Sequence, residues 1–128
     1  MKLVQVALRA TDLDRAAAFW ADLVGSAPAG RFEPPGLLFF DLDGTRLLLE
    51  GNAPSSMLYL EVADLRATLE LLVGRWGGRV EVISEPHPTF DHEDDALGPA
   101  GTTEWQAFVR DPDGNLVGLI AFEPTTAL

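Results

Sequence analysis

The chain has 128 residues, 47% of them hydrophobic, and its 20 acidic residues against 9 basic ones give a formal net charge of −11. That length suits one domain with its own core and is too short for two ordinary domains. The acidic field repels nucleic acid and anionic membrane surfaces, so we expect neither as a partner; it either favours a cationic ligand or serves only to keep the protein soluble.

The sequence lacks the features of several further classes of protein and of functional site. It contains no cysteine, which excludes a disulfide framework and a thiolate metal site. No apolar run reaches the roughly 18 residues that a membrane-spanning helix needs. Met1-Lys2 leads directly into a strand pattern without signal-peptide architecture, so we expect a cytoplasmic location. Phosphate-loop, Ser-His-Asp and His-Glu-x-x-His patterns are also missing.

The chain begins with a pattern of one strand followed by one helix. Alternating residues predict a strand over 3–10, and Asp12 and Gly25 are typical of the start and the end of a helix. We expect Phe19 and Trp20 to pack in the core rather than stack on a ligand. The apolar positions that share one helical face are Leu13, Ala16, Ala17, Trp20, Leu23 and Val24.

Three strand patterns follow this helix, at residues 26–32, 37–42 and 45–50. The last two flank Asp43-Gly44, which is typical of a tight turn. Residues 51–56 are rich in small residues and turn formers, and we expect them to link two halves of the chain.

The second half repeats this order. Residues 57–62 predict a strand, Asp64 predicts a helix start, and Gly77-Gly78 predicts its end. Residues 79–84 predict a further strand, and residues 85–103, which carry both histidines, predict a long loop that covers a site. The expected buried face of the helix is Leu65, Leu69, Leu72, Val73 and Trp76.

A hairpin pattern closes the sequence. Two apolar runs flank Asp111-Pro112-Asp113-Gly114-Asn115, in which proline pre-sets φ and Gly114 or Asn115 can take positive φ. Asp43-Gly44 superposes on Asp113-Gly114, and the strand and helix start at residues 6–13 superpose on residues 58–65. The chain is therefore a single domain, 1–128, that duplicates a unit of roughly sixty residues. Module one covers about residues 1–51 and module two about residues 56–123.

This duplicated β-α-β-β-β pattern, together with the Asp-Leu helix starts and the Arg110–Asn115 hairpin, resembles the vicinal oxygen chelate superfamily. The superfamily includes glyoxalase I, bleomycin-resistance proteins, extradiol dioxygenases and methylmalonyl-CoA epimerase. The resemblance implies an α+β fold in which two tandem modules form curled mixed sheets around a cleft. It identifies a fold more than an activity, because members share architecture across several chemistries.

In the enzymes of this superfamily, one residue from each of four strands binds a divalent metal. The resemblance places these ligands at Gln5, Leu48, Met57 and Gly118. Only Gln5 offers a donor suited to a hard or borderline divalent ion. We therefore expect no metal and no other cofactor. Glu50 and Glu61 lie two residues and four residues from such positions, on the same strand faces, and either could return a carboxylate to the site after a register slip.

Period-two alternation predicts which side chains face the ligand. By the resemblance, Arg9 holds an anionic ligand group, or else it pairs with Glu61 at the module seam. Trp105 and Phe108 either form an aromatic wall or lie in the core, and His87 is either a site residue on the long loop or a solvated side chain. The candidate ligand-binding residues are Gln5, Arg9, Leu48, Glu50, Met57, Tyr59, Glu61, His87, Trp105 and Gly118.

The leading functional hypothesis is a metal-free homodimeric protein that binds or sequesters a small organic ligand, such as a cationic antibiotic. An alternative is a metal-dependent lyase, isomerase or dioxygenase with a rearranged site that uses Gln5, Glu50, Glu61 and His87. A third hypothesis is a cofactor-free acid/base enzyme in which Glu50 or Glu61 is the catalytic group. The sequence leaves open whether any reaction is catalysed.

Overall fold

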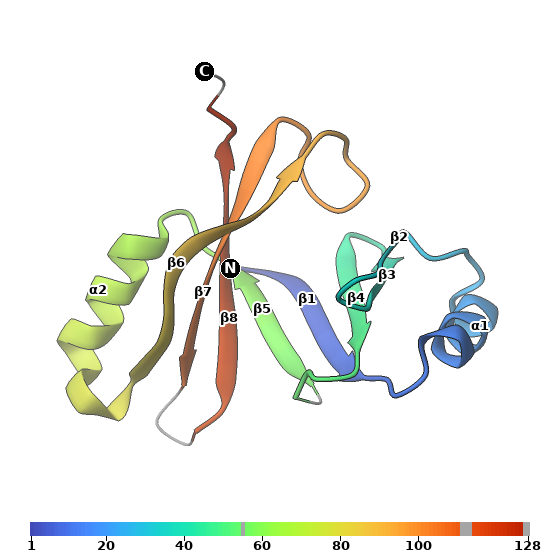
Figure 1. The fold of residues 1–128 in the computed structure, drawn as a ribbon. Coiled ribbons are helices and arrows are strands. Elements are labelled where there is room, and N and C mark those ends of the chain that lie inside the picture. The colour runs from blue at the N-terminus through green and yellow to red at the C-terminus, as the bar shows by residue number, and fades with distance from the viewer. Residues whose placement is uncertain (55, 111–113, 127–128) are drawn as a thin grey trace. The chain divides into compact units, whose positions relative to one another are not determined.

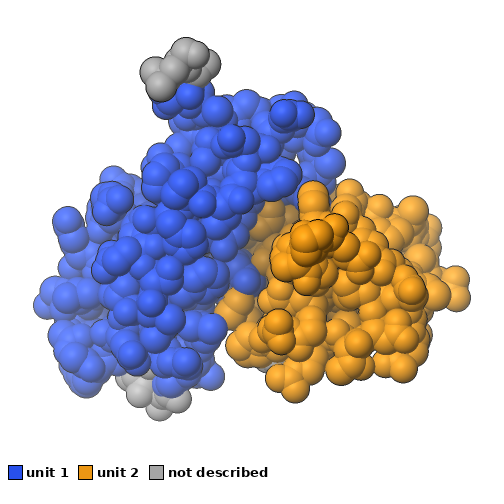
Figure 2. Space-filling model, viewed as in Figure 1, with its two compact units in different colours: residues 1–3, 58–128 blue, residues 4–57 orange. Residues whose placement is uncertain are grey.

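The computed structural model describes residues 1–54, 56–110 and 114–126 (Figure 1). The chain divides into two compact units. The N-terminal unit comprises residues 4–57, orange in Figure 2, and the C-terminal unit comprises residues 1–3 and 58–128, blue in Figure 2. Each unit contains one α-helix and a set of four strands, as the duplicated sequence pattern predicts.

The N-terminal unit follows the predicted order closely. Its strands pair in the order β2-β3-β4-β1, with β1 parallel to β4 and the other pairs antiparallel. The predicted bounds of β3 and β4 are confirmed, whereas β2 is shorter than expected. The elements are β1 (Lys2–Arg9), α1 (Leu13–Val24), β2 (Gly30–Phe32), β3 (Leu37–Leu42) and β4 (Thr45–Glu50).

Local capping fixes both ends of α1. Asp12 Oδ1 accepts a hydrogen bond from the Arg15 amide at 3.0 Å, and Gly25 ends the helix at a φ of 83°. The helix covers a core of Leu38, Phe40, Leu47 and Leu49, against which Trp20 packs. The prediction for Phe19 was wrong, because its side chain lies outside that core and is 60% exposed.

The strands of the C-terminal unit pair in the order β5-β8-β7-β6, with β5 parallel to β8. Asp64 caps α2 by accepting from the Ala67 amide at 3.0 Å. The elements are β5 (Met57–Glu61), α2 (Leu65–Trp76), a 3-10 turn (Gly77–Arg79), β6 (Glu81–His92), β7 (Thr102–Arg110) and β8 (Leu116–Pro124).

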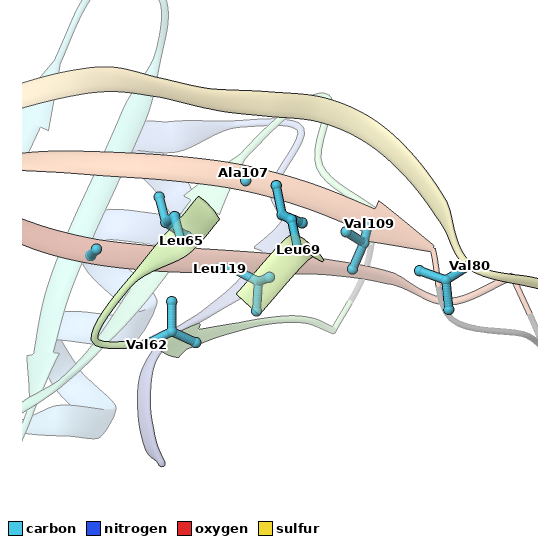
Figure 3. Packing of buried hydrophobic residues seen from close by; sticks show 8 residues of the cluster. Val62, Leu65, Leu69, Val80, Ala107, Val109 and Leu119 are labelled. Carbon is cyan, nitrogen blue, oxygen red and sulfur yellow. The ribbon is translucent and has the colours of Figure 1, made fainter. Parts of the chain in front are cut away.

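The helix α2 packs on one face of its sheet (Figure 3). Leu65 and Leu69 are buried there, and Leu72 packs against them. The prediction that Val73 and Trp76 share this buried face was wrong, since they are 45% and 43% exposed. The Trp76 ring instead lies under the Arg79 guanidinium, 4.9 Å from its centroid, where a cation–π contact stabilises it at the surface. The core of this unit comprises Val62, Leu65, Leu69, Val80, Ala107, Val109, Leu119 and Ala121.

The predicted long loop at 85–103 was also wrong. Residues 85–92 belong to β6, which pairs with β7 as far as His92 and Thr102, so the connection spans only residues 93–101. Pro86 and Pro88 suggested a loop because proline cannot donate to a ladder. β6 is an edge strand with register shifts beside both prolines, and these are the positions at which a sheet tolerates proline.

Both predicted hairpins are confirmed. Gly44 adopts a φ of 95° between β3 and β4, and its amide donates to Asp41 Oδ1 at 2.8 Å. Arg110 and Leu116 are paired across the ladder of β7 and β8. Residues 111–113 of that turn lie outside the described residues. None of the helices in the described ranges is long and apolar enough to cross a membrane.

We predict that Asp64→Ala lowers the free energy of unfolding by about 1 kcal/mol, because the Ala67 amide loses its cap. Denaturant titration followed by circular dichroism measures this change. Glu70→Ala, at an exposed position inside α2, is the matched control and should be neutral or slightly stabilising. Equal losses in both variants would contradict a role for the cap.

Candidate functional site

In the N-terminal unit, the sheet face opposite α1 carries a buried polar pair. Gln5 and Arg46 are neighbours across the β1–β4 ladder, and the Arg46 Nε donates to Gln5 Oε1 at 2.8 Å. Their side chains are almost wholly buried, and the guanidinium lies 5.7 Å from the centroid of the Phe39 ring. The amide oxygen that would ligate a metal is therefore bound to a cation, which opposes a second cation beside it.

The same ladder brings Ala7 beside Leu48 and Arg9 beside Glu50. Leu48 is buried and offers no ligand atom, whereas Arg9 is exposed at the end of β1. Glu50 is half-buried, and burial raises the pKa of its carboxyl group above the ordinary glutamate value. The surroundings of Glu50, a predicted catalytic candidate, therefore favour the protonated form of its carboxyl group.

In the C-terminal unit, the side chain of Tyr59 lies beside Gly118, the position at which the resemblance places a metal ligand. Tyr59 pairs with Gly118 across β5 and β8. A Cβ atom on Gly118 would lie only 2.5 Å from Tyr59 Cδ2 and 2.9 Å from Cε2. The space beside Gly118 is therefore filled by the tyrosine ring.

The Tyr59 ring also contacts a second aromatic ring. It meets Phe108 edge to face, with centroids 5.8 Å apart. Tyr59 itself is buried, and so is Met57 at the start of β5. This part of the predicted ligand surface is consequently a packed aromatic contact rather than an open metal position.

A second polar network in this unit lies on β6 and β7. His92 Nε2 and Glu104 Oε1 are 2.9 Å apart, and Gln106 Nε2 donates to Glu104 Oε2 at 2.7 Å. Both His92 and Glu104 are buried, and His92 ends β6 instead of lying in the predicted long loop. The His92 ring lies between Phe90 and Phe122, with centroids 4.8 and 5.7 Å away.

The remaining predicted residues of this unit separate onto two faces. His87 lies in β6, not in a loop; its Nδ1 is 2.8 Å from the Glu85 carbonyl oxygen and therefore donates to it. Glu61 is half-buried at the end of β5. Trp105 packs against the core under α2, on the face opposite Gln106 and Phe108. It does not belong to an aromatic wall with Phe108.

Four polar residues of these faces were not among the predicted site residues: Arg46, His92, Glu104 and Gln106. Alternation along β7 could have identified two of them, since Glu104, Gln106 and Phe108 share one strand face. His92 was missed because the prolines obscured β6. Nothing in the sequence indicated that Arg46 would donate to Gln5.

These residues do not fit the metal site that the resemblance implies. Leu48, Met57 and Gly118 supply no donor, and the Gln5 oxygen is engaged by Arg46. Within the residues that the structure describes, no group of three or more histidine or acidic side chains could hold a metal ion. Pairing between Arg9 and Glu61 stays a prediction.

The sequence matches the Glyoxalase/Bleomycin resistance protein/Dioxygenase superfamily over residues 2–119. A superfamily member from Vibrio splendidus 12B01 is 17% identical, with a TM-score of 0.70 over 94% of this chain and 97% of that chain. A hypothetical protein from Bacillus halodurans C-125 is 15% identical, with a TM-score of 0.69 over 99% and 98%. Methylmalonyl-CoA epimerase from Mycobacterium tuberculosis is 16% identical, with a TM-score of 0.61 over 97% and 88%.

Searching the curated proteins gave no match. At these identities the solved structures show the fold alone: an α+β arrangement of two βαβββ modules with mixed, curled sheet. The predicted fold class is confirmed.

We predict that Gly118→Ala destabilises the protein by about 1–3 kcal/mol, because the new methyl group overlaps the buried Tyr59 ring. Gly74→Ala is the matched control: a Cβ there meets no atom within 4 Å, so the change should stabilise α2 by about 0.5–1 kcal/mol. Denaturant titration measures both changes. A Tyr59→Leu background should reduce the cost of Gly118→Ala, and strict additivity would refute the steric cause.

A second prediction concerns Glu50. Its folded-state pKa is raised by burial, so its contribution to stability is present below the unfolded pKa of about 4.3 and is lost as pH rises through the folded pKa. Glu50→Gln cannot ionise, and its stability relative to wild type should therefore increase between pH 4 and pH 7. Denaturant titrations at several pH values measure the difference, with Glu70→Gln as a control for removal of one charge. A relative stability that falls with pH would show that Glu50 is stabilised in its charged form.

Proposed function

Because the chain belongs to the Glyoxalase/Bleomycin resistance protein/Dioxygenase superfamily, we propose that it is a metal-independent protein that binds a small organic ligand. The observation that carries this proposal is the Tyr59 ring, which fills the position of a metal ligand at Gly118. The Gln5–Arg46 pair supports it, since it places a guanidinium where a metal ion would have to lie. We further propose a cytoplasmic homodimer.

We propose that each unit carries its own candidate ligand surface, on the polar sheet face opposite its helix. In the N-terminal unit it includes the exposed Arg9 and the half-buried Glu50. In the C-terminal unit it includes Glu61, His87 and Phe108, all half-buried. Apolar walls with a few polar groups are typical of a pocket for an organic molecule, and the net charge of −11 favours a cationic one.

One specific observation favours a second function. Glu50 has a pKa raised by burial and lies beside Arg9 in the ladder. A carboxyl group whose pKa is raised by burial stays protonated to a higher pH than an exposed one, which suits it to general acid catalysis. The second candidate is therefore a cofactor-free acid/base enzyme in which Glu50 accepts or donates the proton. Its turnover would resist chelators and would be abolished by Glu50→Gln.

We predict that the protein retains no stoichiometric metal. After incubation with excess Ni, Zn, Mn or ferrous iron and extensive dialysis, elemental analysis should find far less than one equivalent per chain, because three of the four positions lack donors. One retained equivalent that Glu50→Gln removes would contradict metal independence and favour a rearranged catalytic site.

Ligand binding is tested by calorimetric titration with a metal-free cationic glycopeptide antibiotic. We expect saturable binding that Glu50→Gln weakens and that Glu70→Gln, an exposed acid on α2, leaves unchanged. If no heat is observed at high micromolar concentration, the version of the proposal with a cationic antibiotic fails.

A further inference from the structure

A surface pocket of about 380 Å³ lies where β1 passes into α1, entirely within the N-terminal unit. Its wall runs from Arg9 through Thr11 and Asp12 to the second turn of α1 at Phe19 and Trp20. This volume is in the range of pockets for small molecules. None of the four superfamily metal positions lines it, and Arg9 is the one residue that it shares with the ligand surface proposed above.

One side of the pocket is cationic. Arg9 and Arg15 both line it, and Arg15 Nη2 donates to Thr11 Oγ1 at 3.2 Å, which restrains the guanidinium beside the pocket. The acid in the wall, Asp12, accepts from the Arg15 amide as the helix cap. The residues that line the pocket therefore include two arginines and one acid, which gives a local positive charge in a protein of net charge −11. The planar arginine fork matches a carboxylate.

The other side of the pocket is aromatic. The Phe19 side chain is 60% exposed, although its ring is held edge to face against Trp20 at 5.6 Å and 84°. Trp20 in turn packs against the core under α1. An exposed ring with a fixed orientation offers a surface on which a second flat ring can stack, and Ala16 and Leu49 extend the apolar wall.

We propose that this pocket binds a small aromatic monocarboxylate. Its carboxylate accepts hydrogen bonds from Arg15, with Arg9 as the second cation, and its ring lies against Phe19. The combination is selective because a neutral aromatic molecule lacks the partner for the guanidinium groups, whereas a small inorganic anion lacks the ring. The site shares Arg9 with the ligand surface proposed above, but its main contacts, Arg15 and Phe19, are not part of that surface, and it uses neither Glu50 nor Tyr59.

The test is a titration of the full chain with 1-naphthoate, followed by calorimetry and by ¹⁵N NMR of the Trp20 indole and Arg15 Nε resonances. We expect saturable binding with a Kd on the order of 0.1–1 mM, and shifts at both resonances. Arg15→Gln should weaken binding about tenfold or more, because a charge-assisted hydrogen bond is lost. Phe19→Ala should weaken it severalfold; Phe19 is exposed, so this variant should retain the fold, which circular dichroism checks.

Two matched controls, one variant and one ligand, test whether the Arg15 guanidinium and the ligand carboxylate account for the binding. Arg66→Gln removes an exposed arginine from the first turn of α2 and should leave the affinity unchanged. The uncharged 1-naphthalenemethanol should bind about tenfold more weakly than 1-naphthoate. The proposal is overturned if no saturation occurs by about 10 mM, if Arg66→Gln weakens binding as much as Arg15→Gln, or if the alcohol binds as well as the acid. Failure here leaves the metal analysis and the glycopeptide titration unaffected, so the two proposals fail separately.

Discussion

The close approach of the Tyr59 ring to the backbone of Gly118 is the constraint on which the candidate site of the C-terminal unit depends. Only a residue without Cβ allows a ring to lie this near the neighbouring strand, because a methyl group would lie 2.5 Å from Tyr59 Cδ2. The parallel pairing of β5 and β8 sets these residues opposite each other. The tyrosine then meets Phe108, which continues the contact to β7. The Tyr59 ring, Gly118 and the register of β5 and β8 therefore depend on one another, so a change in any one of them disturbs the packing of the other two.

Each unit also contains buried polar side chains that are satisfied by hydrogen bonds to one another. Burying the Arg46 guanidinium costs several kcal/mol unless partners compensate it. Gln5 supplies one partner at 2.8 Å, and the Phe39 ring supplies a cation–π contact. In the other unit both oxygens of Glu104 are engaged, one by His92 and one by Gln106. Such groups fix strand register, because a slip of one residue would leave a charged or polar group buried without a partner.

The features that were predictable from the sequence are those with local causes. The Asp12 and Asp64 caps, the Gly25 helix end and the Asp-Gly turn after β3 each follow from residues a few positions apart. The duplication of the chain, and hence the fold class, followed from the same local signals repeated. The α1 core face was also predictable, because helical spacing alone selects it.

The features that were not predictable depend on which strands become neighbours. Pro86 and Pro88 argue against a strand unless that strand is known to lie at a sheet edge, which β6 does. Trp105 could be assigned to a face only relative to the α2 core. The Tyr59 ring lies against Gly118 because β5 pairs with β8. A glycine in a strand pattern does not by itself indicate which side chain will approach it. Residue type therefore located the site strands, but not what fills the space between their side chains.

In each unit the helix covers one sheet face, and the superfamily metal positions lie on the opposite face. This arrangement explains how the chain can keep its fold without the ligands of a metal site. Each unit buries one sheet face under its helix, and the two helix cores contain none of Gln5, Leu48, Met57 and Gly118. Substitutions at those four positions leave the main sources of apolar burial in place. They are constrained only by their immediate neighbours, such as Arg46 for Gln5 and Tyr59 for Gly118. Because the helix-covered faces supply apolar burial independently of these four positions, the opposite faces can carry a guanidinium or an aromatic ring where the superfamily enzymes carry metal ligands.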